Sequence, residues 1–268
     1  MSEYLGKKIG EGKTKKIWEI PGTSEVLIES NEAITAGDGV RRDEFPGKGS
    51  LATKTTANSF SLLNRAGIPN HFIRLEGDNT FRAEKLRMIP IELVARRLAY
   101  GSYLKRNPEA EAGTKFSNIE FEMFSKDDPN EDPFIVLDFD KGTIRRHNAK
   151  LPVSEETLID EVPITESVYG ISEDQLITLR QLTEETFGVL EAAWADLGVT
   201  LVDIKIEAGF TETGGIVVGD VIDNDNWRIW PDGEPSRMMD KQLYREGHPI
   251  SDVAESYLWV ADATNSFA

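Results

Sequence analysis

The alternation of apolar and charged residues after position 200 is the feature that most constrains the fold. Asp203, Lys205 and Glu207 are separated by single apolar residues in LVDIKIEAGF, so in a strand all three share one face. GIVVGDVID follows after FTETG, which predicts an antiparallel hairpin that returns Asp220 toward Glu207. A strand with one face in the core and the other in water explains the same alternation at this point.

The first hundred residues predict a hairpin, a helix and further strands. KKIWEI and SEVLIES alternate on either side of PGTS, and a helix is expected from Ser50 to about Arg65. HFIRLEG and NTFRAEKLRMIPIELVARRLA predict strands, the second of which is interrupted at Pro90.

The remainder of the chain predicts one long irregular region and one strong helix. Residues 101–162 are expected to be irregular, with turn chemistry in KDDPNEDP. Ser172 and Gln175 form a capping-box pattern at the start of a helix that ends at Gly198, and a short helix is plausible near the C-terminus. Because these elements show little βαβ regularity, they favour an α+β fold with antiparallel sheets and flanking helices.

Composition excludes several classes of protein. The chain of 268 residues contains no cysteine and three histidines, which excludes disulfides and thiolate sites and favours a hard, oxygen-bound metal ion such as Mg²⁺. Its formal net charge of -17 argues against nucleic-acid binding. No apolar run approaches the roughly 20 residues of a membrane span, and MSEYLGKK lacks the features of a signal peptide, so a cytoplasmic location is expected.

A glycine-rich turn near the N-terminus is a candidate for binding phosphate. GKKIGEGKTKKIWEI does not match the phosphate loop of nucleotide-binding proteins, because Gly6 stands one place too far from Gly12, Lys13 and Thr14. A Gly-x-Gly turn between two strands can still lay backbone N–H groups and Lys13 over phosphates. A plain hairpin turn is the alternative.

The predicted hairpin after position 200 is a candidate for binding metal and phosphate. Opposed side chains across an antiparallel pair lie about 5 Å apart, so Glu207 and Asp220 would repel each other unless a cation lay between them. Magnesium bridging nucleotide phosphates would satisfy both carboxylates, with Lys205 holding phosphate oxygen beside the metal. Alternatively, Lys205 only neutralises its acidic neighbours.

A second anion site is expected from three other segments. Arg96 comes at a strand end, Ser102 follows Gly101 in a turn, and Arg228 lies near the second hairpin. PGKGS places Lys48 at the start of the first helix, where an anion is also favoured.

Several of these segments together resemble the phosphoribosylaminoimidazole-succinocarboxamide synthase (SAICAR synthetase) family. They occur in the family's order over nearly the whole chain, and some look closest to the synthetase part of the animal bifunctional enzyme. Because the chain ends at Ala268 without a carboxylase part, a monofunctional enzyme is expected. The matching segments are EGKTKKIWE, PGKGSLATKTTANSFSLLNRAGIPNHFI, RMIPIELVARRLAYGSYLKRNP, FSKDDPNEDP, LVDIKIEAGF, and GDVIDNDNWRIWP followed by DKQLYR.

The resemblance implies an ATP-dependent ligase of purine biosynthesis. It would condense 5-aminoimidazole-4-carboxylate ribonucleotide with L-aspartate, through an acyl phosphate, and release ADP and phosphate. The family's two-lobed fold is similar to ATP-grasp and kinase-like enzymes, which implies an N-terminal β-rich lobe at residues 1–87 and a larger lobe at 88–268, with ATP in the cleft. The implied cofactors are ATP and Mg²⁺, the partners are small-molecule substrates, and a homo-oligomer is possible.

The resemblance also implies roles for particular residues of the site. ATP is assigned to Gly12, Lys13, Lys15, Lys85, Met88 and Glu92, the last three in an adenine-pocket stretch. Magnesium is assigned to Glu207 and Asp220, with Lys205 beside them, and the ribonucleotide 5′-phosphate to Arg96, Ser102 and Arg228. The remaining substrate groups are assigned to Asp38, Lys48, Lys241 and Arg245, although TAGD replaces the family's usual Ser-Ala-Phe-Asp around Asp38.

Two alternative functions stay open at this point. A small-molecule kinase of related fold would turn over ATP without aspartate. A nucleotide-binding regulatory module would lack the metal carboxylates or Lys13, and this chain has all of them.

Overall fold

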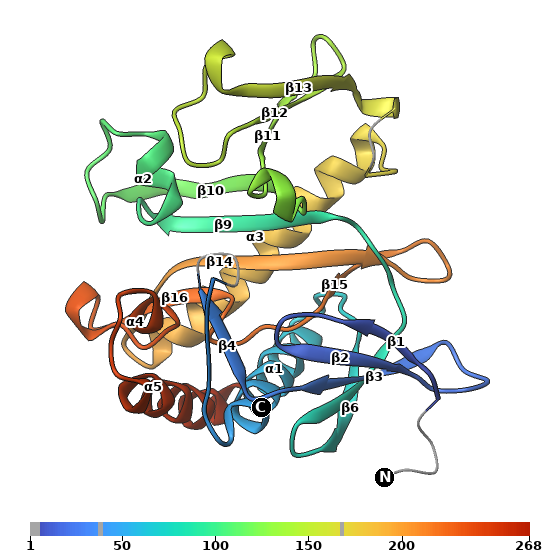
Figure 1. Cartoon of the computed structure of the whole chain (residues 1–268), viewed down its shortest axis with the longest axis vertical. Coiled ribbons are helices and arrows are strands. Elements are labelled where there is room, and N and C mark those ends of the chain that lie inside the picture. Colours follow the sequence, from blue (N-terminus) through green and yellow to red (C-terminus); the bar gives the residue numbers. More distant parts are fainter. Residues whose placement is uncertain (1–5, 37–39, 167–168) are drawn as a thin grey trace.

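Two antiparallel sheets form the framework of the protein, a computed structural model that describes residues 6–36, 40–166 and 169–268 (Figure 1). The smaller sheet has five strands in the order β1-β2-β3-β7-β6. Its strands are β1 (Lys8–Glu11), β2 (Lys15–Glu19), β3 (Glu25–Ser30), β6 (Phe72–Gly77) and β7 (Thr80–Glu84). The predicted hairpin is confirmed, since β2 and β3 pair antiparallel from Lys15↔Ser30 to Glu19↔Val26.

The larger sheet has nine strands and is centred on one long strand. β14 (Val199–Phe210) pairs with β9 (Ile91–Leu98), β15 (Ile216–Gly219), β16 (Trp227–Pro231) and β8 (Arg87–Met88). The sheet continues beyond β9 through β10 (Lys115–Ser125), β11 (Phe134–Asp138), β12 (Thr143–His147) and β13 (Leu158–Pro163). β14 and β15 form the antiparallel hairpin expected from the sequence, with Glu207 opposite Gly219.

The alternation in β14 has the expected structural result. Ile204 and Ile206 have no exposed surface and belong to the main hydrophobic core, while Asp203, Lys205 and Glu207 border the cavities described below. A strand that is buried on one face and lines cavities on the other cannot shift by one residue without exchanging the two sets.

The expectation of an irregular region at 101–162 is wrong. That region contains β10 to β13 and the short helix α2 (Ser102–Arg106). β11 to β13 are short strands of five or six residues, and charged pairs such as Arg146–Asp160 link neighbouring strands. Charged cross-strand pairs stabilise a sheet but erase the apolar alternation that identifies a strand in a sequence.

The two predicted helices are confirmed. α1 spans Lys48–Arg65, and α3 spans Glu173–Asp196. Ser172 caps α3 by accepting from the backbone N–H of Gln175 at 3.3 Å, and the Gln175 side chain accepts from the N–H of Ser172 at 2.9 Å. α3 packs behind the larger sheet against β9 and β14 (Figure 1), and its buried apolar residues belong to the main core.

The C-terminal region is more helical than expected. It contains α4 (Gln242–Arg245) and the 14-residue helix α5 (Ile250–Ala263), which packs against α1. A second small core joins Tyr244 and Tyr257 to Ile34 and Phe45, around the two-stranded sheet of β4 (Ala33–Ala36) and β5 (Arg41–Glu44). Among the described residues, no helix is long and apolar enough to span a membrane.

Candidate active site

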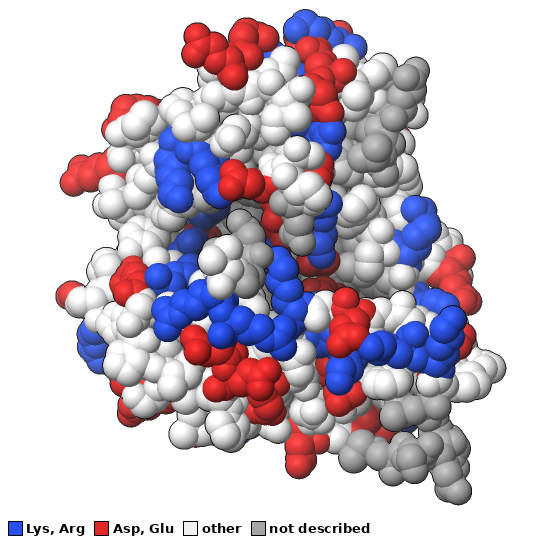
Figure 2. Space-filling view, viewed as in Figure 1, with Lys and Arg blue, Asp and Glu red and all other residues white. Residues whose placement is uncertain are grey.

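Two neighbouring cavities open along β14. The first, here called the inter-sheet cavity, has a volume of about 670 Å³ and lies between the smaller sheet and the β8, β14 and β15 end of the larger sheet. The second, here called the arginine pocket, has a volume of about 250 Å³ and is lined by Arg96, Arg228 and Arg245. Figure 2 shows Lys and Arg side chains gathered around a hollow on this face, although the whole chain carries a net charge of -17.

The inter-sheet cavity combines an apolar wall with the glycine-rich turn. Ile17, Val26 and Ile28 form the wall, and the exposed side chain of Met88 faces the same space. Such a wall suits a flat aromatic ring. Gly12, Lys15 and Lys85 also line the cavity, as their expected role requires, whereas Lys13 is exposed on the adjoining turn.

Two lysine–carboxylate pairs lie in the inter-sheet cavity. Lys15 is ion-paired with Asp220, and Lys126 Nζ donates to both carboxylate oxygens of Glu207 at 2.8 Å. Burial raises the pKa of Glu207, and the negative charge of Asp220 raises it further. Burial also works to raise the pKa of Asp220, but the Lys15 ammonium outweighs it and holds that pKa below its ordinary value.

The carboxylate pair fits a magnesium ion that is shared with phosphates. Mg²⁺ commonly takes one or two protein carboxylates and completes its shell with phosphate oxygens and water. Glu207 and Asp220 provide that number of hard oxygen ligands, and the described residues contain no group of three or more metal-ligating side chains that would form a complete protein site. The negative charge of Asp220 contributes to the raised pKa of Glu207, so a cation beside the pair would favour the ionised carboxylate.

Asp220 is held in a rare backbone conformation by a residue that the sequence analysis missed. Its φ is +62°, which a residue other than glycine seldom adopts. The buried ring of His71 lies with Nε2 at 2.9 Å from the carbonyl oxygen of Asp220. Because burial lowers the pKa of His71 to about 4, the ring is neutral near pH 7 and donates this hydrogen bond.

Lys205 and Glu92 lie together, although their expected roles are separate. Lys205 was expected beside the metal carboxylates, and Glu92 in the adenine pocket. The two side chains instead form an ion pair with each other and line the arginine pocket. Glu92 alternates on β9 with the core residues Ile91 and Leu93, so it takes the face opposite to theirs, which borders that pocket.

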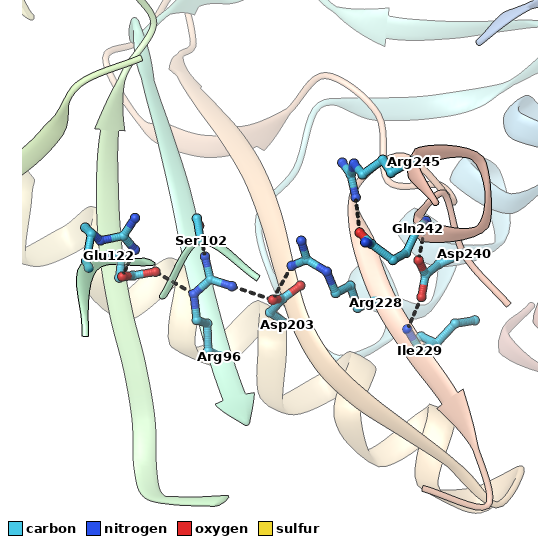
Figure 3. Close-up of polar contacts among 10 residues, drawn as sticks. Arg96, Ser102, Glu122, Asp203, Arg228, Ile229, Asp240, Gln242 and Arg245 are labelled. Atoms are coloured by element: carbon cyan, nitrogen blue, oxygen red, sulfur yellow. Dashed lines mark hydrogen bonds and ion pairs between the residues drawn. The ribbon is translucent and has the colours of Figure 1, made fainter. Parts of the chain in front are cut away.

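The arginine pocket is built on a row of buried charges that Figure 3 shows in part. Arg96 donates to Glu122 and Asp203, and its third nitrogen lies 3.1 Å from Ser102 Oγ. Arg228 Nη1 donates to the same Asp203 at 2.6 Å. The structure therefore brings Arg96, Ser102 and Arg228 together, as the sequence predicts. Arg228 Nε is buried without a partner in the described part of the chain.

Gly101 makes this arrangement possible. It has a positive φ of 61°, and a Cβ atom added there would lie 2.6 Å from Arg228 Nη2. Any larger residue would therefore collide with the guanidinium group that Asp203 holds.

The residues assigned to the remaining substrate groups lie in two places. Lys48 and Lys241 both approach Asp225, at 3.6 and 3.3 Å, and Tyr257 donates to the same carboxylate. Burial would raise the pKa of Asp225, but the two ammonium groups outweigh it and hold that pKa well below its usual range. Arg245 lines the arginine pocket instead, as does Asp225. Asp38 lies outside the described residues.

Sequence reasoning missed four polar residues of the site besides His71. Glu122 alternates with Phe121 and Met123, a signal that could have identified it. Asp203 was recognised as part of the charged face but was not given a role. Asp225 was not distinguished from its acidic neighbours in DNDN, and nothing in the sequence singles out Lys126.

The two cavities define a class of enzyme. One has an apolar wall and a pair of carboxylates, the other has clustered guanidinium groups, and both share β14. This arrangement is typical of an enzyme that uses a nucleoside triphosphate to activate a second, anionic substrate.

Comparison with known proteins identifies the family. The family model described as SAICAR synthetase matches residues 8–258. A phosphoribosylaminoimidazole-succinocarboxamide synthase of Herpetosiphon aurantiacus is 40% identical over 98% of this chain and 98% of its own length. The multifunctional protein ADE2 of Gallus gallus is 40% identical over 96% of this chain, which covers 58% of that protein. A solved structure described as SAICAR synthetase (Type-2) in complex with ADP superposes with a TM-score of 0.78 and 30% identity, over 95% of this chain and 96% of the other.

The chain therefore belongs to the SAICAR synthetase family. The predictions of an α+β fold and of an ATP-dependent ligase of purine biosynthesis are confirmed.

Proposed function

We propose that the two cavities carry the two halves of one ligation. ATP would occupy the inter-sheet cavity, and 5-aminoimidazole-4-carboxylate ribonucleotide would occupy the arginine pocket. L-Aspartate would enter beside the arginine pocket. The observation that carries this proposal is the position of β14, which supplies Glu207 to one cavity and Asp203 and Lys205 to the other. The four residue steps from Asp203 to Glu207 span about 13 Å of strand, a distance suited to two neighbouring ligands.

The nucleotide end follows from the inter-sheet cavity. The adenine ring would lie against Ile17, Val26 and Met88, with Lys85 at the edge. Gly12 and Lys15 would face the phosphates, and the adjoining Lys13 would reach them from the exposed turn. The structure described with ADP supports a nucleotide in this fold.

Glu207 and Asp220 would hold Mg²⁺ between the protein and the nucleotide. When bound, the ion supplies charge neutralisation for the transferring phosphoryl group. Lys15 and Lys126, which contact these carboxylates, would turn toward phosphate oxygens. His71 would keep Asp220 in its unusual conformation throughout.

The ribonucleotide would bind by its two anionic groups. Its 5′-phosphate would meet Arg228 and Ser102, with Arg96 fixing both through Asp203 and its own contact to Ser102. We assign Arg245 to this end too, because it lines the same pocket. The imidazole carboxylate would point toward Lys205, on the side of Glu207, where the γ-phosphoryl group arrives.

L-Aspartate would bind beside Asp225. Lys48 and Lys241 provide two positive charges there for its carboxylates, and Asp225 provides a negative charge for its ammonium group. We keep Asp38 as a candidate for this end from the family resemblance alone.

The chemistry requires positioning more than a protein nucleophile. A carboxylate does not react with an amine because oxide would be the leaving group. Transfer of the γ-phosphoryl group to the carboxylate oxygen gives an acyl phosphate and ADP. Attack of the aspartate amine on the acyl carbon then breaks the bond to phosphate, forms the amide and releases a proton from nitrogen. Fixed lysines and arginines along β14 can stabilise the charge in both steps.

The lobe division at residue 87, a cytoplasmic location and assembly into a homo-oligomer are proposed from the family resemblance and the sequence alone.

Phosphate release tests the proposed reaction. We expect release from Mg-ATP to require both the ribonucleotide and L-aspartate, with the succinocarboxamide detected by mass. ATP turnover that ignores aspartate and leaves a stable phosphorylated product would contradict the ligase and point to a small-molecule kinase.

A further inference from the structure

A fully buried carboxylate, Asp240, ties two elements of the arginine pocket together. Its side chain has no exposed surface. One oxygen accepts the backbone N–H of Ile229 at 3.0 Å, and the other accepts the backbone N–H of Gln242 at 2.7 Å. Ile229 belongs to β16 and Gln242 begins α4, so a single side chain anchors the helix to the strand (Figure 3).

Each of these two hydrogen bonds lies next to an arginine of the pocket. Arg228 directly precedes Ile229, and Arg245 is the last residue of α4. Arg245 Nη1 lies 3.4 Å from the side-chain oxygen of Gln242, so its direction depends on where α4 begins. Two guanidinium groups that face one small pocket repel each other, and a displaced α4 would let them separate.

We propose that Asp240 is a positioning residue that fixes the spacing of Arg228 and Arg245, so that both guanidinium groups bind one phosphate monoester. The inference rests on the proposed assignment of the ribonucleotide's 5′-phosphate to this pocket. The carboxylate acts on the two arginines through the backbone of Ile229 and Gln242, whose N–H groups donate to it.

The protonation state of Asp240 predicts in which direction anion affinity changes with pH if this role is correct. Burial raises the pKa of Asp240 to about 6, against the opposing effects of its two N–H donors and of Arg228 and Arg245, the charged groups that face it. A protonated carboxyl group carries its own O–H and accepts less well from one of the two N–H groups. Acidification should therefore loosen one anchor, although removing the negative charge would by itself strengthen anion binding.

Asp240→Asn is the first test, because it keeps the shape and loses one acceptor. Calorimetry should show about tenfold weaker binding of the ribonucleotide, with unchanged binding of the ribonucleoside that lacks the phosphate. Val260→Ala, a cavity variant in the buried core of α5, controls for lost stability. Equal affinity for the ribonucleotide in Asp240→Asn and wild type would overturn the proposal, as would an equal loss in Val260→Ala. A wild type that binds ribonucleotide and ribonucleoside equally would instead refute the phosphate site itself.

A second measurement needs no variant, in case Asp240→Asn does not fold. Inorganic sulfate keeps its charge between pH 7.5 and 5.5, so its direct calorimetric titration into the protein reports the pocket alone. We expect sulfate affinity to fall severalfold as the pH is lowered through about 6. Affinity that stays constant or rises would show that charge, not positioning, is what Asp240 supplies.

Discussion

Replacing Gly101 by alanine should damage ribonucleotide binding through Arg228. The new Cβ atom would lie 2.6 Å from Nη2 and 2.8 Å from Cζ of Arg228, closer than real Cβ contacts come. The backbone at Gly101 cannot easily move, because φ is +61° and α2 begins at the next residue. Arg228 would therefore leave its 2.6 Å contact with Asp203.

The loss of ribonucleotide affinity can be separated from the loss of folding stability that backbone strain at position 101 would cause. An alanine at positive φ costs roughly 1 to 3 kcal/mol of stability. If the displaced Arg228 no longer donates to the phosphate, the loss of that one hydrogen bond between charged groups costs about 1.5 to 3 kcal/mol, which corresponds to about a 10- to 150-fold weaker affinity. Gly113→Ala is a matched control, because Gly113 has φ +82° but no atom within 4 Å of the added Cβ.

Steady-state kinetics with both variants would test this reasoning. Gly101→Ala should raise the KM for the ribonucleotide by about one to two orders of magnitude, with little change in the KM for ATP. Gly113→Ala should lose similar stability in urea and keep both KM values. If the two variants raised the ribonucleotide KM equally, the close approach of Gly101 and Arg228 would have no functional meaning.

Three further predictions concern other parts of the site. Glu207→Gln should lower turnover at least about 100-fold with the fold intact, and unchanged turnover at saturating Mg²⁺ would refute the metal assignment. Lys48→Met should raise the KM for L-aspartate roughly tenfold or more while the KM for ATP stays constant; equal changes in both would count against the aspartate assignment. Because the pKa of Asp240 is about 6 in the folded protein and its ordinary value is 3.8, the folded state binds the extra proton, and wild-type stability should fall by roughly 2 kcal/mol as the pH rises from 4 to 6. Asp240→Asn should lack this component in urea titrations, and an identical pH profile would contradict the burial argument.

The sequence correctly predicted those elements that can be identified from a few neighbouring residues. The cap of α3 and the alternation in β14 each lie within a few neighbouring residues, and both are present in the structure. β12 and β13 escaped prediction because charged pairs such as Arg146–Asp160 occupy positions where apolar residues would mark a strand.

The residues that line the site were predicted better than the contacts between their side chains. Arg96, Ser102 and Arg228 meet as expected, because their roles depend on residue type and on neighbouring turns. The pairing of Lys205 with Glu92 could not be predicted, since it depends on the register of β9 against β14. Register is set by packing across the whole sheet, and no single segment contains that information.

The shared strand also limits how this enzyme can change. Since Asp203, Lys205 and Glu207 project from consecutive outward positions of β14, the separation of the two cavities is fixed by backbone geometry rather than by loops. One inserted residue between Asp203 and Glu207 would turn one of these carboxylates into the hydrophobic core. β14 therefore fixes the distance between the two cavities. New substrate preferences have to arise at the edges of the cavities, where loops and α4 can vary without altering the length of β14.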